Sequence, residues 1–209
     1  MKQINLMSLF RKLFNKSGSK PASDKGDEIE RSKYMPDLDT PVDERFTRNF
    51  ILNGGKFLYG VNINDVHTNF DNILLENDWY ENDVLCLDTN LQDIFKGYNL
   101  KFGKNRESSF FLTTCESLVA DNGSLLVCSK QLKEMKLQEL PRNMVVYAKT
   151  SQIVQTIGEG LRIIKNTNKG DIPTNITTIK HFEDTQEEKN FMTYGSSTKN
   201  LYLLLLEDL

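Results

Sequence analysis

The sequence has 209 residues, of which 38% are hydrophobic, and its formal net charge at neutral pH is −3. This length is sufficient for one domain with its own core and an extension. The negative charge and a sequence pI of about 5.5 argue against nucleic-acid binding, which normally needs a basic surface. No apolar run has the length that a bilayer crossing requires, so we expect no transmembrane segment.

The N-terminal part divides into two predicted segments. Residues 1–16 have the spacing of an amphipathic helix, which docks on its own domain or a dimer mate or else contacts a membrane surface or a partner. Residues 17–45 are polar and predict a flexible linker. Arg11 and Lys12 interrupt the first apolar run and no small-residue cleavage site follows, so we expect a cytoplasmic protein.

The remaining chain, residues 46–209, predicts one α/β domain in which short strands alternate with amphipathic helices. Such alternation is typical of a mostly parallel sheet. The predicted strands are 56–59, 83–87, 109–113, 124–128, 144–148 and 201–206. Helices are predicted after Asn64, after Thr89 or Asn90, and after Thr150 or Ser151 as N-caps, with a short helical or irregular piece over 132–140.

Cysteine and histidine are scarce. The three cysteines form no C-x-x-C pair and at least one is unpaired, which favours a reducing compartment. His67 and His181 lie far apart in the sequence. We therefore expect no metal or iron–sulfur cluster to be bound by this chain alone.

The stretch around Asn122-Gly123 carries the clearest local pattern, an apolar run, a tight turn and a second apolar run. Asn-Gly favours a two-residue type I′ hairpin turn, in which both central residues have positive φ. Its polar residues also predict a ligand-contacting edge, because turns at strand ends present backbone N–H groups to anions. The candidate ligand-binding residues here are Asp121, Asn122, Gly123 and Ser124.

Three further observations concern chemistry. Asp121 and Glu116 are candidates for a catalytic acid or base. Lys199 follows a small polar loop and is a further candidate for contacting an anionic ligand. The sequence contains no G-x-G-x-x-G, P-loop or G-x-S-x-G motif.

From Phe110 to Ile164 the sequence resembles the LUD-domain proteins, the lactate utilization proteins of the LutC/YkgG type. The family's Ala-[Glu/Asp]-Thr-Gly-[Ser/Thr] motif corresponds to Ala120–Ser124, with Asn122 in place of threonine. A Leu-Pro, a strand and an Ile-Val follow in the family's order at Leu140-Pro141, Met144–Ala148 and Ile153-Val154.

The resemblance implies a layered α/β fold similar to the NagB/RpiA/CoA-transferase group, with helices packed on a sheet. It also implies a link to the oxidation of L-lactate to pyruvate. In that setting this chain is a cluster-free accessory or small-ligand-binding subunit, and iron–sulfur clusters belong to partner subunits. Two alternatives stay open, an isomerase or acyl/CoA-transferase-like enzyme and a non-catalytic interaction protein with a vestigial pocket. A homodimer also stays open.

Overall fold

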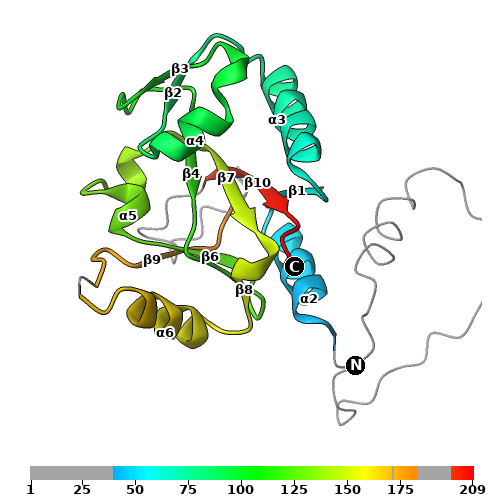
Figure 1. The fold of residues 1–209 in the computed structure, drawn as a ribbon, viewed down its shortest axis with the longest axis vertical. Coiled ribbons are helices and arrows are strands. Elements are labelled where there is room, and N and C mark those ends of the chain that lie inside the picture. Colours follow the sequence, from blue (N-terminus) through cyan, green and yellow to red (C-terminus); the bar gives the residue numbers. More distant parts are fainter. Residues whose placement is uncertain (1–39, 171, 183–198) are drawn as a thin grey trace, which may run out of the picture. The chain divides into compact units, whose positions relative to one another are not determined.

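The computed structural model describes residues 40–170, 172–182 and 199–209 (Figure 1). The helix predicted over 1–16 and most of the linker predicted over 17–45 lie outside these residues. The first described helix, α2, spans Val42–Leu52, so it begins inside the stretch predicted as linker. Its apolar side chains explain this start, since Phe46 and Phe50 lie one turn apart and both are fully buried.

A six-stranded sheet forms the centre of the domain, and every strand pair in it is parallel. The strand order is β1-β10-β7-β4-β2-β3. The sheet therefore confirms the predicted α/β class. Its strands are β1 (Lys56–Gly60), β2 (Asp83–Leu85), β3 (Lys101–Gly103), β4 (Phe110–Thr114), β7 (Asn143–Lys149) and β10 (Asn200–Leu206).

A second, four-stranded sheet has the order β8-β5-β6-β9. It consists of β5 (Ser117–Val119), β6 (Ser124–Val127), β8 (Ile153–Val154) and β9 (Thr177–Ile179). The predicted hairpin belongs to this sheet, because β5 and β6 pair antiparallel. β8 joins β5 in parallel and β9 joins β6 antiparallel.

The other described helices are α3 (Ile63–Asn77), α4 (Thr89–Ile94), α5 (Ser129–Leu132) and α6 (Ile157–Thr167), with 3₁₀ turns at Lys96–Tyr98, Leu137–Glu139 and Thr150–Gln152. The predicted N-caps were wrong. Asn62 and Asp88 cap α3 and α4, and Thr156 caps α6. The last helix starts later than predicted because Ile153 and Val154 pair with β5 instead.

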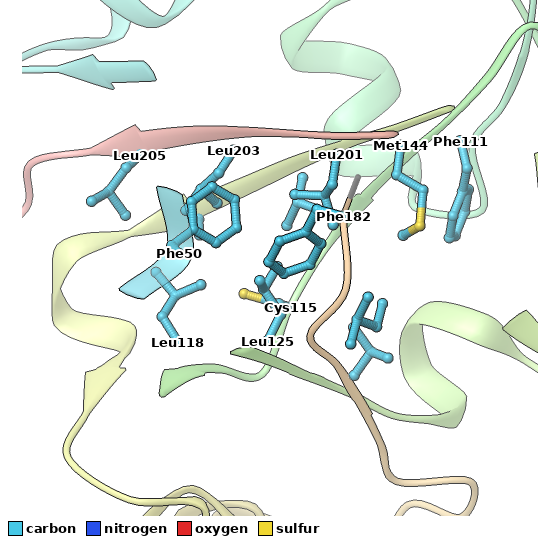
Figure 2. Close-up of a cluster of buried hydrophobic side chains, with 14 of the residues drawn as sticks. Phe50, Phe111, Cys115, Leu118, Leu125, Met144, Phe182, Leu201, Leu203 and Leu205 are labelled. Atoms are coloured by element: carbon cyan, nitrogen blue, oxygen red, sulfur yellow. The ribbon is translucent and has the colours of Figure 1, made fainter. Parts of the chain in front are cut away.

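Strand alternation sorts the side chains of the central sheet into two cores. Val145, Tyr202 and Leu204 face α3 and α4. Met144, Leu201 and Leu203 face the second sheet, where they meet Leu118 and Leu125, as Figure 2 shows. Figure 2 also places Phe50 and Phe182 between the two sheets. The domain is thus layered as helices, parallel sheet, second sheet and α6.

Candidate functional site

The hairpin prediction is confirmed, but the predicted type I′ turn was wrong. Val119 pairs with Ser124, which leaves the four residues Ala120–Gly123 as the loop. A type I′ turn needs positive φ at both central residues. Gly123 has φ of 65°, but Asn122 is not among the described residues with positive φ. The Gly123 N–H donates to the Val119 carbonyl at 2.9 Å, so a single left-handed residue closes the loop.

Side chains of α2 and of its C-cap residue hold the backbone of this loop. The Asn49 side-chain amide donates to the carbonyls of Ala120 at 2.8 Å and Asp121 at 3.2 Å. One turn later, the Asn53 amide donates to the carbonyl of Asn122 at 2.7 Å. We call Ala120–Gly123 the docked turn, because its carbonyls are satisfied by a helix that lies about 70 residues earlier in the chain.

The side chains of the docked turn are engaged within the domain. Asp121 forms an ion pair with Arg45 at 3.6 Å, and both side chains are partly exposed. The Asn122 side-chain oxygen accepts from the N–H and the hydroxyl of Ser124, which is fully buried. None of these residues lines the cavities described below. Their predicted role in ligand binding stays a prediction.

Lys199 is 3% exposed and lies just before β10. Its ammonium group donates to the carbonyls of Leu140 at 2.8 Å and Pro141 at 3.0 Å. Burial lowers the pKa of Lys199 from 10.5 to about 8. The contacts shown therefore join the start of β10 to the Leu-Pro segment before β7.

Glu116 lies two residues after the end of β4 and is half-buried. One carboxylate oxygen accepts from the Gln131 side-chain amide at 2.9 Å and from the Cys128 thiol at 3.4 Å. Burial raises the pKa of the Cys128 thiol and that of Cys115, and it raises the pKa of Cys86 to about 11. These thiols are protonated at neutral pH, which makes them poor nucleophiles.

The topology of the central sheet identifies another place for a ligand. β2 and β4 are neighbours in the sheet. The chain runs from β2 to β3 on one side of this pair, and the next strand of the sheet after β4 is β7, on the opposite side. In open parallel sheets, ligands bind outside the carboxyl ends of the strands where such connections diverge. The edge formed by the carboxyl ends of β2, β3 and β4 is therefore the expected position.

A cavity of about 770 Å³ lies at this edge. Leu87 follows β2, Lys104 and Arg106 follow β3, and the other lining residues come from α5, the turn after it and the segment before β9. We call it the basic cavity. Its lining residues are Leu87, Lys104, Arg106, Ser129, Lys133, Glu134, Met135, Thr174 and Asn175.

Three cations and one carboxylate, Glu134, line the basic cavity. Arg106 pairs with Glu139 at 3.3 Å. Lys104 and Lys133 form no ion pair with any residue of the described ranges. A cavity with two such ammonium groups beside a guanidinium attracts carboxylate or phosphate.

The backbone at the wall of the basic cavity is unusual. Lys133 has φ of 54° and ψ of −123°, a backbone conformation that residues other than glycine rarely adopt. It ends α5, where its N–H donates to the Ser129 carbonyl at 2.8 Å. Ser129 is in turn bound to Thr174, whose N–H donates to the Ser129 hydroxyl oxygen at 3.0 Å. Backbone strain of this kind concentrates at functional sites. Here the unusual backbone angles set the direction in which the Lys133 side chain extends from the backbone.

Lys104, Arg106 and Lys133 were not among the residues predicted from the sequence. They come from two separate segments that only the sheet topology brings together. One signal was available, since Lys104 and Arg106 follow a Phe-Gly pair in a polar stretch before a predicted strand. The short strand β3, however, has no apolar alternation that would have marked it.

Two further features of the described residues bear on the class of protein. They contain no group of three or more histidine, cysteine, aspartate or glutamate side chains placed to hold a metal ion. None of the helices in the described ranges combines the length and the apolar character needed to cross a bilayer.

A parallel α/β domain with a cavity at the carboxyl edge of its sheet is the class that fold and cavity define. Residues 101–206 match the model of the LUD domain, and the chain belongs to the LUD-domain family. Among solved structures, the chain is similar to a DUF162 family protein from Deinococcus radiodurans, with a TM-score of 0.56 and 12% sequence identity. The alignment covers 80% of this chain and 96% of that one. No curated protein matches the sequence.

Proposed function

We propose that this LUD-domain chain binds a small organic anion in the basic cavity, as a cluster-free component of a lactate utilization system of the LutC/YkgG type. The observation that carries the proposal is the position of Lys104, Lys133 and Arg106 at the carboxyl edge of the central sheet. Membership of the LUD-domain family supports the link to lactate utilization. In this role iron–sulfur subunits are the electron-carrying partners.

The charge balance of the cavity supports an anion as the ligand. Arg106 is held by Glu139, so Lys104 and Lys133 are the groups that gain most from a bound carboxylate. All three cationic residues are exposed, so the site is open to solvent and its ion pairs are weakened by salt. We therefore expect modest affinity that falls as ionic strength rises.

Binding is tested by titration calorimetry of the full chain with L-lactate, pyruvate and inorganic phosphate at low ionic strength. We expect saturable binding of at least one of these anions, weakened about tenfold in Lys104→Gln and in Lys133→Gln. The matched control is Lys165→Gln, an exposed lysine of α6 that lines none of the described cavities. Equal affinity in all four proteins contradicts the proposed site, and no binding of any anion contradicts the proposed function.

The cellular role is tested by deleting the gene in the source organism and measuring growth on L-lactate and on glucose. We expect a defect on lactate alone. Complementation with the unaltered gene restores growth, whereas Lys104→Gln/Lys133→Gln does not. Normal growth of the deletion strain on lactate contradicts the lactate utilization role.

Glu116 supports an enzymatic alternative. It lies at the carboxyl end of β4, and Gln131 fixes its carboxylate at 2.9 Å. A carboxylate held in this way suits an acid/base role in an isomerase or acyl/CoA-transferase-like reaction. If turnover of a lactate- or acyl-derived substrate is found, Glu116→Gln should reduce kcat at least 100-fold. Unchanged kcat in this variant removes Glu116 from the reaction.

A further inference from the structure

A second cavity adjoins the basic cavity. It has a volume of about 590 Å³ and lies between the segment 132–138 and the segment around β9. Glu134, Met135 and Asn175 line both cavities, so the two share a wall. We call the second one the apolar cavity.

The apolar cavity differs from its neighbour in what forms its interior. Leu132 and Ile179 are buried members of the core between the two sheets, and Met135 and Leu137 are half-buried against the same core. The other eight lining residues are polar or charged, and the charged ones, Glu134, Lys136 and Lys180, are exposed rather than buried in the core. Hydrocarbon that enters this cavity leaves water and contacts core side chains.

The wall between the cavities includes one adaptable side chain, that of Met135. Met135 is unbranched and half-buried, and it follows the strained Lys133 by two residues. A thioether side chain of this kind rearranges at low cost to admit a ligand. A ligand anchored at Lys133 therefore has an apolar surface within its reach at Met135.

Size supports the same conclusion. Each cavity falls in the range of about 300–1,000 Å³ that accommodates drug-sized ligands. A three-carbon acid leaves most of this space empty. A longer molecule with one anionic end spans both cavities, with its hydrocarbon against Leu132, Leu137 and Ile179.

We propose that the ligand is an amphipathic organic anion, whose acidic group lies among Lys104, Arg106 and Lys133 and whose hydrocarbon chain extends past Met135 into the apolar cavity. This inference rests on the proposed anion site and specifies what binds there. It makes chain length the determinant of selectivity, since the cationic groups treat all carboxylates alike.

The test measures the affinity of the full chain for straight-chain carboxylates from acetate to octanoate. Once the chain reaches the apolar cavity, each added methylene should strengthen binding about fourfold. In Leu137→Asn this dependence should flatten while the affinity for acetate stays unchanged. The matched control is Leu161→Asn on α6, which is 40% exposed, lines none of the described cavities and should keep the dependence.

The outcomes separate this inference from the one beneath it. If acetate binds and longer acids bind no better, the amphipathic ligand is excluded while the anion site stands. The inference also fails if the dependence on chain length is equal in Leu137→Asn and the unaltered protein. If no acid binds, both proposals fail. Thermal unfolding shows whether Leu137→Asn is folded, and Met135→Gln replaces it if it is not.

Discussion

At the docked turn, Asn49 of α2 and Asn53, the C-cap of that helix, donate to backbone carbonyls, and Gly123 lies against the helix backbone. At the basic cavity, neither Lys104 nor Lys133 forms an ion pair with a carboxylate of the described residues. Both regions are polar stretches beside strand ends. The difference is that the polar groups of the turn are bonded within the domain, whereas the two ammonium groups have no ion-pair partner among the described residues. Substitutions should therefore affect stability at the turn and binding at the cavity.

The largest effect is expected at Gly123. A Cβ there would lie 2.3 Å from the Asn49 carbonyl carbon, and φ of 65° disfavours any side chain. Because the obstacle is backbone, Gly123→Ala should reduce the free energy of unfolding by about 3 kcal/mol or more in urea titrations. Gly97→Ala, where a Cβ meets nothing within 4 Å, is the control and should change it by less than about 0.5 kcal/mol.

Lys199 resembles the docked turn in that its polar group is bonded within the domain. Its effect on stability should depend on pH. Its pKa is lowered from 10.5 to about 8 when the protein folds, so the unfolded chain binds the proton more tightly. The contribution of this group to stability is therefore gained as pH rises from about 8 to 10.5 and lost as pH falls back. The gain is on the order of 3 kcal/mol.

Urea titrations of the unaltered protein and of Lys199→Met between pH 7 and 10.5 measure this contribution. Taking the difference in unfolding free energy between the two proteins cancels the titration of the groups common to both. This difference should grow as pH rises. A constant difference would contradict the assignment.

An intermediate effect is expected where α6 packs on the hairpin. A Cβ at Gly160 would lie 2.5 Å from the Leu126 side chain and 3.3 Å from Ser117. Gly160→Ala should cost about 1–2 kcal/mol of unfolding free energy despite the better helix propensity of alanine. Gly158 has ordinary space around it, so Gly158→Ala should be neutral or stabilising by about 0.5 kcal/mol. Similar destabilisation by both would mean that packing does not distinguish them.

The smallest effects on stability make the sharpest contrast in binding. Asp121→Asn removes a partly exposed ion pair with Arg45 and should cost no more than about 1 kcal/mol. It should leave anion affinity unchanged, whereas Lys133→Gln should weaken anion binding with little change in stability. If instead Asp121→Asn weakened anion binding and Lys133→Gln did not, the ligand would bind at the docked turn, as the sequence motif predicts.

Much of the fold was predictable because buried strands and amphipathic helices repeat at their own periods. Leu201–Leu206 and Met144–Ala148 are continuous apolar runs, and both lie in the middle of the central sheet. Strands β3 and β9 are three residues long and partly exposed, so no periodicity marked them. The start of helix α2 was not predicted, because its first turn is charged and follows a proline.

The site was harder to predict than the fold. The motif around Asn122 and Gly123 correctly indicated a hairpin, but its fit against Asn49 depends on a contact across about 70 residues. The three cations of the basic cavity belong to no local motif. Their proximity depends on the order of strands in the sheet, which local sequence does not specify.

The place of β10 in the sheet has a consequence for how the chain assembles. β10 is the last described strand in the sequence, yet it lies between β1 and β7 and pairs with both along most of its length. Until it inserts, β1 and β7 each present an open strand edge, a surface prone to join edges of other chains. We therefore expect slow, concentration-sensitive refolding, measured as a refolding yield that falls as protein concentration rises.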